Sequence, residues 1–307
     1  MKNLIRYRLI SVAIGLFLTI AALEFFLRLL GFGFNVLFVL PKNKGADYKI
    51  FCVGESTTFG IGASNPMLQN YPNQLENMLN KNQQFSVKKI QCFFDQTIGQ
   101  NTSEILMKLP RYIKKYNPDL LIFMVGINNW WNLDKSNILL FNKKRYIPEF
   151  ALKTLIFLDR FRSWKLLKWV VYSLGLIKER WNYYGLNNPT QEDVRRLWDG
   201  IRNRYNCNIF EEIAEHDMRE MMEICRANNI RVIICSYPIE SGRLYYIHKS
   251  IAQKFKVPFV DNFETFKRLS NKEKYLSKNN FGHPNEEGYR IIAENIYRCI
   301  IENGLIK

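Results

Sequence analysis

From residue 49 onward, apolar runs of strand length alternate with amphipathic segments of helical length. The run at 119–126 is almost wholly apolar, which is typical of a strand buried on both faces. The predicted strands are 49–54, 86–94, 119–126, 231–238 and 257–261, and the predicted helices are 71–80, 102–116, 209–227, 244–255 and 285–301. Such alternation predicts βαβ units and therefore a parallel sheet with helices on both faces.

The first 40 residues predict a membrane anchor. Residues 9–23 carry no charge, and the apolar character resumes after Glu24 and again after Arg28. A bilayer core needs about 20 helical residues, so the span includes Glu24 and reaches toward Arg28. These two residues are four apart, on one helical face, where they can pair. We expect one retained transmembrane helix; the alternatives are a cleaved signal peptide and a buried core helix.

The charges that flank this segment indicate its orientation. Lys2, Arg6 and Arg8 precede the apolar run and favour a cytoplasmic amino terminus. We therefore expect a single-pass membrane protein whose globular domain is extracytoplasmic, in the periplasm or at the cell surface.

The remaining chain divides into a linker at 41–48 and one α/β domain at 49–307. A basic, aromatic stretch at about 130–206 interrupts the alternation of strands and helices, at a place where a short connection between two strands would suffice. We interpret it as a helical insertion. It is either a partly packed, solvated cap or a lid or surface segment resting on an anionic membrane.

The net charge and the sequence motifs indicate which classes of binding partner and cofactor to expect. The formal net charge of +16 favours an anionic surface such as phospholipid or acidic glycan, but no zinc-finger or RNP-like motif indicates a nucleic-acid partner. The six cysteines include no CxxC pair and are interpreted as small buried hydrophobes. No metal-ligand cluster, P-loop or dinucleotide fingerprint occurs, so we expect no metal and no cofactor.

Four polar segments follow predicted strands, at the sheet edge where open α/β folds bind ligands. They are 54–60 (GESTTFG), 97–102 (TIGQNT), 126–129 (GINN) and 280–285 (NFGHPN). Each has a structural explanation alone: Ser56 can cap a helix, Gly99 can supply a turn, Asn128 can form an Asx-turn, and His283 can be a loop histidine. Together they indicate a site, because the fold brings all four to one edge.

The residue types fit acyl transfer. A serine hydroxyl needs an adjacent base to become a nucleophile, and a neutral imidazole serves near pH 7. We therefore assign Ser56 as nucleophile and His283 as its base. The oxyanion of a tetrahedral intermediate needs fixed donors. The backbone N–H groups of Ser56 and Gly99 and the side-chain amide of Asn128 are the candidates.

These segments resemble the four blocks of the SGNH/GDSL hydrolase family, in order and over about 49–301. The family's serine, glycine, asparagine and histidine correspond to Ser56, Gly99, Asn128 and His283, and HPNxxGY is the most specific motif. The resemblance implies the SGNH hydrolase fold, a flavodoxin-like three-layer α/β/α arrangement around a five-stranded parallel sheet. It also implies an ester substrate.

Three positions depart from the family pattern. Glu55 and Asn129 each stand where the family has Asp, and we expect little direct effect. The third departure is Asn280, at the position of the triad acid. Three outcomes are open. His283 works in a Ser–His dyad, oriented by a backbone carbonyl or by the side chain of Asn280. Alternatively another carboxylate takes the place of the triad acid, with Asp261 the nearest by topology, or the enzyme is slow or inactive. In a serine protease, Asp to Asn at this position lowers turnover by about 10⁴.

The sequence thus predicts a serine-dependent acyl-ester hydrolase of the esterase or lipase type. Its substrate would be an O-acetyl group on an envelope glycan or an acyl chain on a lipid-like molecule. Two alternatives stay open. One is an acyltransferase to a sugar hydroxyl through the same acyl-serine, and the other is a catalytically silent glycan- or lipid-binding module, which Asn280 favours.

Overall fold

The computed structural model describes residues 2–38, 45–82, 85–87, 89–129, 132–142, 148–173, 209–278 and 282–306. Its centre is a parallel sheet of five strands in the order β2-β1-β3-β4-β5. The strands are β1 (Tyr48–Gly54), β2 (Ile90–Phe94), β3 (Leu120–Met124), β4 (Arg231–Cys235) and β5 (Phe259–Val260). The predicted fold class, a three-layer α/β/α arrangement around a five-stranded parallel sheet, is confirmed.

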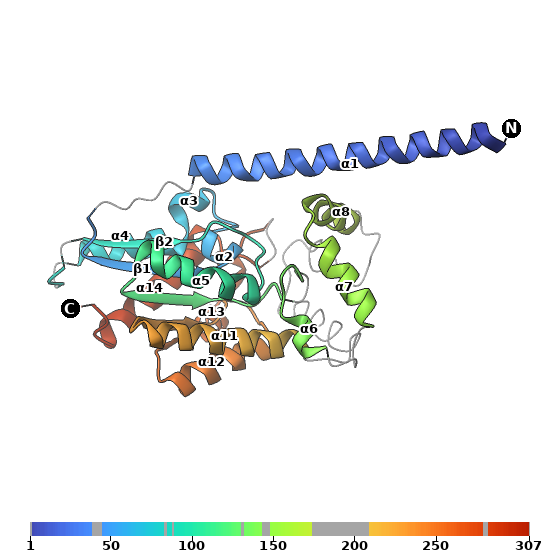
Figure 1. Cartoon of the computed structure of the whole chain (residues 1–307). Helices are drawn as coiled ribbons and strands as arrows, with labels where there is room; N and C mark the ends of the chain where they lie inside the picture. Colours follow the sequence, from blue (N-terminus) through green and yellow to red (C-terminus); the bar gives the residue numbers. More distant parts are fainter. Residues whose placement is uncertain are drawn as a thin grey trace.

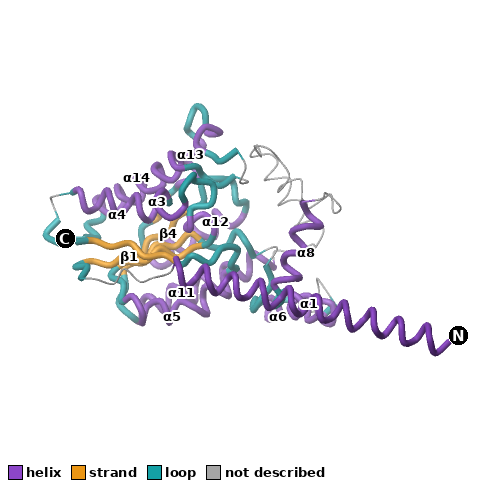
Figure 2. The backbone as a smooth tube through the Cα atoms, turned by 90° about the horizontal axis from the view of Figure 1, so that it is seen from above, coloured by secondary structure: helices purple, strands orange, loops and turns teal. Residues whose placement is uncertain are grey.

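Helices cover both faces of the sheet. One face carries α4 (Tyr71–Lys81) and α14 (Glu286–Glu302), and the other carries α5 (Thr102–Tyr116), α11 (Ile209–Ala227) and α12 (Arg243–Phe255). Figure 2 shows the strands as a layer between α4 and α14 on one side and α5 and α11 on the other. Short helices fill the connections: α2 (Ser56–Phe59), α3 (Pro66–Gln69), α13 (Asn262–Lys267) and the 3-10 turn η1 (Lys272–Tyr275).

Two apolar cores result from the alternation of side chains along each strand. In β1, Ile50 and Cys52 pack toward α4 and α14, whereas Phe51 and Val53 pack toward α5 and α11. Cys52, Cys92, Cys225, Cys235 and Cys299 are buried free thiols, as predicted; Cys207 lies outside the described residues. Both faces of the central strands are therefore dry, which accounts for their unbroken apolar sequence.

The edge strands are shorter than predicted. The second strand starts at Ile90 and not at residue 86, because its only sheet neighbour, β1, starts at Tyr48, the residue that pairs with Ile90. The fifth strand has two residues because its continuation, Asp261, already caps α13. The third and fourth strands likewise end earlier than predicted, at Met124 and Cys235.

The amino-terminal helix α1 (Lys2–Phe38) runs along one side of the domain, and its amino-terminal part extends beyond the domain (Figure 1). Within it, the segment Arg6–Phe32 is long and apolar enough to cross a bilayer, although a signal sequence meets the same criteria. The predicted pair is present: Arg28 Nε donates to Glu24 Oε1 at 2.8 Å. The predicted linker at 41–48 falls partly outside the described residues, which resume at 45.

The insertion is helical where the structure describes it. It contains α6 (Ile138–Phe141), α7 (Glu149–Leu158) and α8 (Arg162–Ser173); residues 130–131, 143–147 and 174–206 lie outside the described part. Helix α8 packs against α1. Glu24 Oε2 accepts hydrogen bonds from the backbone N–H and the hydroxyl of Ser163, at 2.8 and 2.9 Å. We call the contacts of Glu24 and Arg28 with residues 160–163 the anchor clasp.

Candidate active site

Ser56 lies where β1 ends and α2 begins. Its carbonyl accepts from the N–H of Gly60 at 3.0 Å, so the turn is helical from its first residue. The N-cap of α2 is Glu55, and no side chain caps this helix. The structural explanation for Ser56, helix capping, therefore does not apply, and its hydroxyl has another partner.

That partner is His283, whose Nε2 lies 2.7 Å from Ser56 Oγ. The distance fits a serine hydroxyl donating to an imidazole with its proton on Nδ1. Both residues are half-buried. A hydroxyl and a base 227 residues apart in sequence thus meet at the carboxyl edge of the sheet.

The backbone of the His283 loop is fixed by its neighbours. Ser277 donates its N–H to the carbonyl of His283 at 2.8 Å, and Leu276 and Pro284 form an antiparallel bridge. Gly62 packs on the same loop with φ +105°, and a Cβ there would lie 2.5 Å from the carbonyl oxygen of Pro284. Only glycine combines this conformation with so close an approach, so residues 60–62 hold the histidine loop against the serine loop.

Glu55 ties the serine loop to the loop that carries Asn128. It is fully buried, and its Oε1 accepts from the N–H of Gly126 at 2.8 Å. Its Oε2 accepts from the hydroxyl of Tyr237 at 2.7 Å. Burial raises the pKa of Glu55 to about 7. One carboxyl group therefore connects the ends of β1, β3 and β4, directly beside Ser56.

Asn128 is buried in the turn after β3, next to the serine loop, because Gly54 of β1 pairs with Met124 of β3. Gly99 lies in the loop after β2 with φ +70°. Asn132 joins the two loops, since its Nδ2 donates to the carbonyl of Gly99 at 2.7 Å. The glycine and asparagine segments are thus fixed to each other as well as to the sheet.

Two aspartates support these loops, Asp95, which is half-buried, and Asp217, which is fully buried. Asp95 accepts from the N–H of Thr97 at 3.2 Å and from Gln100 Nε2 at 2.9 Å, which shapes the turn around Gly99. Asp217 accepts from the hydroxyl of Thr102 at 2.7 Å. These contacts were not predicted: Asp217 is distant in sequence from all four polar segments, whereas Asp95, two residues before the segment 97–102, was close enough to be a candidate.

Asn129 binds the first residue of α5, Thr102, at the same edge of the sheet. Its Oδ1 accepts from the N–H of Thr102, and its Nδ2 donates to the hydroxyl of Thr102, both at 2.9 Å. That hydroxyl can then donate to Asp217. An aspartate at 129, as in the family pattern, could not donate in this way, so the departure at 129 fits the buried carboxylate at 217.

The described residues include no assigned triad acid for His283. Asn280 lies outside the described residues. Asp261, the nearest alternative by topology, caps α13 through Glu264 N–H at 3.0 Å and accepts from the hydroxyl of Tyr245 at 2.7 Å. Its two oxygens are therefore committed to structural contacts. Within the described part of the chain, no group of three His, Cys, Asp or Glu side chains is placed to hold a metal ion.

Comparison with protein families identifies the family of this chain. The profile of the GDSL-like Lipase/Acylhydrolase family matches residues 52–291, which span all four polar segments. The chain therefore belongs to the GDSL-like lipase/acylhydrolase family. No curated protein matches it.

Among solved structures, the chain is similar to a lipase/acylhydrolase from Enterococcus faecalis, at 13% identity and a TM-score of 0.44, covering 85% of this chain and 97% of that one. It is also similar to a catalytic mutant of an acetylxylan esterase from Geobacillus stearothermophilus, at 16% identity and a TM-score of 0.47, covering 84% and 95%. A third is a psychrotrophic esterase from Pseudoalteromonas sp., at 11% identity and a TM-score of 0.43, covering 83% and 98%.

Proposed function

We propose that the protein is a serine-dependent acyl-ester hydrolase with Ser56 as nucleophile and His283 as general base. The observation that carries this proposal is the 2.7 Å distance between Ser56 Oγ and His283 Nε2, within a chain of the acylhydrolase family. The substrate would be an acylated glycan, such as one bearing O-acetyl groups, or a lipid-like ester.

The proposed reaction assigns one role to each of these groups. His283 Nε2 takes the proton of Ser56 as Oγ attacks the ester carbonyl. The N–H groups of Ser56 and Gly99 and the amide of Asn128 receive the negative charge that develops on the carbonyl oxygen. The imidazolium then protonates the leaving alcohol, and water attacks the acyl-serine with His283 again as base.

Asn280 would orient the ring in place of a carboxylate. Its side-chain oxygen can accept from the Nδ1 proton and thereby keep Nε2 free to act as base, but it lacks the charge that stabilises an imidazolium. We therefore propose a Ser56–His283 dyad with a turnover below that of a complete triad.

We further propose that α1 is a retained transmembrane helix and that the catalytic domain is extracytoplasmic. The exposed apolar side chains of Arg6–Phe32 support this placement, as do the basic residues at the amino end.

Hydrolysis of p-nitrophenyl acetate by the detergent-solubilised full chain tests the function. Ser56→Ala should lower the rate by about 10⁴ or more, whereas Ser270→Ala, at an exposed turn, should leave it unchanged. Equal rates for the native chain and Ser56→Ala would refute the proposal and favour a silent binding module.

A further inference from the structure

The catalytic edge and the free end of α1 face the same way. In Figure 1 the strands run from the side near the carboxyl terminus of the chain toward the side where α6, α7 and α8 lie. The amino-terminal half of α1 extends beyond the domain on that same side, and Figure 2 gives the same arrangement from above. If α1 crosses a bilayer, the edge with Ser56 and His283 therefore points toward that bilayer.

Helix α8 joins α1 to this edge. On one side, the anchor clasp holds Ser163 to Glu24, and Arg28 donates to the carbonyl of Arg160 at 3.1 Å. Arg162 also donates to the carbonyl of Leu27 at 2.6 Å. These partners on α1 fall late in Arg6–Phe32, at the end of the apolar segment nearer the domain.

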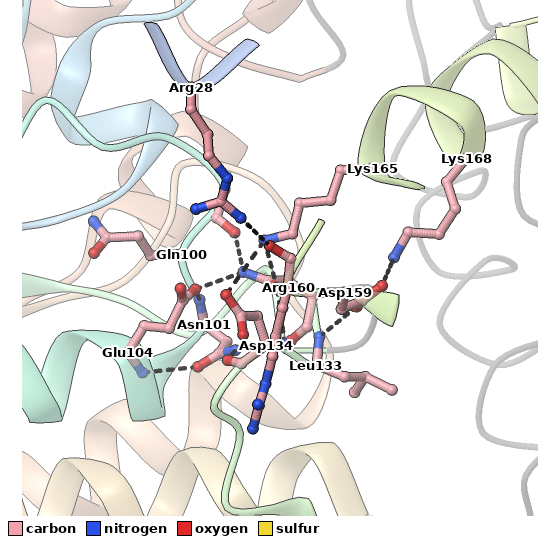
Figure 3. A network of polar contacts seen from close by, with 12 residues as sticks. Arg28, Gln100, Asn101, Glu104, Leu133, Asp134, Asp159, Arg160, Lys165 and Lys168 are labelled. Atoms are coloured by element: carbon pink, nitrogen blue, oxygen red, sulfur yellow. Dashed lines mark hydrogen bonds and ion pairs between the residues drawn. The ribbon is translucent and has the colours of Figure 1, made fainter. Parts of the chain in front are cut away.

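On its other side, α8 is bound to the loop that follows Asn128. Lys168 pairs with Asp159 at 2.5 Å, and Asp159 accepts from the N–H of Leu133 at 3.2 Å. Lys165 lies 3.5 Å from Asn132 Oδ1, and Asn132 is the residue that holds the Gly99 loop. Figure 3 shows these polar contacts between α1, α8 and the edge of the sheet. The insertion is thus fixed between the anchor and the active site.

The insertion presents apolar and basic side chains to the outside. Phe150 is 83% exposed and Phe157 is 55% exposed. Together with Lys153 they are spaced three and four residues apart, on one face of α7. Of the five Lys and Arg in residues 148–173, Lys153, Arg160 and Arg162 are exposed, whereas Lys165 and Lys168 contact Asn132 and Asp159. Aromatic residues beside basic ones on an exposed helix face are typical of a segment that lies on a membrane surface.

We propose that α7 and α8 form a second membrane contact, on the surface of the bilayer that α1 crosses, and that the substrate is an ester carried by a lipid of that bilayer. The inference rests on the proposed function. The reacting ester then reaches Ser56 from the membrane side, and the clasp sets the position of the catalytic edge relative to the lipid headgroups. The exposed basic residues Lys153, Arg160 and Arg162 favour an anionic lipid surface.

The test uses the full chain in nanodiscs that contain an anionic phospholipid. The double variant Phe150→Glu/Phe157→Glu is compared with Ile301→Glu, which changes an exposed apolar residue near the end of α14, at the opposite end of the domain. The rate on a fluorogenic phospholipid ester within the nanodisc should fall about tenfold or more in the double variant only. The rate on water-soluble p-nitrophenyl acetate should stay within about twofold of native in both variants.

An unchanged rate on the lipid ester in the double variant, or an equal fall in Ile301→Glu, would overturn the proposal. Failure of the native chain to hydrolyse either ester would instead refute the proposed function. A measurement without catalysis separates the two cases. An environment-sensitive dye on Phe157→Cys should be quenched by nitroxide-labelled lipids, whereas the same dye on Ile301→Cys should not. Equal quenching at the two positions would also overturn the membrane contact.

Discussion

Two buried glutamates, Glu55 and Glu24, each connect segments that are distant in sequence, but through different kinds of contact. At the catalytic edge, Glu55 accepts from a backbone N–H and a tyrosine hydroxyl. In the anchor clasp, Glu24 pairs with the cation of Arg28 and accepts from Ser163. The first connects loops within one packed domain, whereas the second connects helices 139 residues apart in sequence. Damage to the edge should therefore change the chemistry, and damage to the clasp should change the attachment.

The strongest test of this contrast lies in the oxyanion donors. Asn128→Ala should lower kcat on p-nitrophenyl acetate by about 10²–10³, because it removes a donor used only as charge develops. KM should change little, and the urea midpoint should stay near native. A large rise in KM with an unchanged kcat would place Asn128 in substrate binding and not in stabilisation of the transition state.

The raised pKa of Glu55 should be measurable as a pH dependence of the free energy of unfolding. Burial raises its pKa from 4.5 to about 7, so between these values the folded protein binds more protons than the unfolded chain. Its contribution to stability is complete below pH 4.5 and is lost as pH rises toward 7, at up to about 1.4 kcal/mol per pH unit. In Glu55→Gln this decline should disappear from urea unfolding measured between pH 5 and 7.

The native chain and the variant must be compared pairwise, because His248 has the opposite effect. Burial lowers the pKa of His248 from 6.5 to about 4, so its contribution to stability rises with pH over that interval. Subtracting the two curves cancels His248 and leaves Glu55. Parallel curves would show that Glu55 titrates near its ordinary pKa of 4.5, and that the carboxyl group at the edge is charged throughout the interval from pH 5 to 7.

Disruption of the anchor clasp should destabilise α8 without destabilising the central sheet. Glu24→Ala removes the acceptor of the Ser163 N–H and hydroxyl, worth about 1–3 kcal/mol. Amide exchange in α8 should then accelerate about 10- to 100-fold, while exchange in β3 stays at the native rate. Glu24→Gln keeps an oxygen for Ser163 but loses the ion pair, so its effect should be smaller. Equal acceleration in α8 and β3 would mean that the clasp stabilises the whole domain.

The position of Asn280 gives the smallest expected change. Asn280→Asp should raise kcat about tenfold, because a carboxylate stabilises the imidazolium that forms on His283. The gain should appear with p-nitrophenyl acetate and depend on His283. A lower kcat in this variant would instead favour a dyad built around asparagine, with the amide as the required orienting group.

Local signals were sufficient for several parts of the fold. Helix α5 begins and ends at the predicted residues, and Asn101 and Glu104 form a capping box at its start. The Glu24–Arg28 pair was predictable from its four-residue spacing. The meeting of Ser56 with His283 follows from strand–helix alternation, which places the ends of parallel strands along one edge.

Other contacts depend on tertiary packing and have no local signal. Ser163 meets Glu24 only because α8 folds back on α1. Tyr237 reaches Glu55 because β4 lies next to β3 in the sheet, an order that the sequence does not specify. The extent of β2 depends on where β1 begins. The residue types at the site were therefore predictable, and most of the contacts that hold them were not.

The central claim is that Ser56 is activated by His283. Labelling of the full chain with a fluorophosphonate, followed by mass spectrometry, measures this directly. The account predicts a single adduct on Ser56 that is absent in Ser56→Ala and forms at least about 10³-fold more slowly in His283→Ala. An adduct on another residue, or equal labelling of the native chain and His283→Ala, would contradict it.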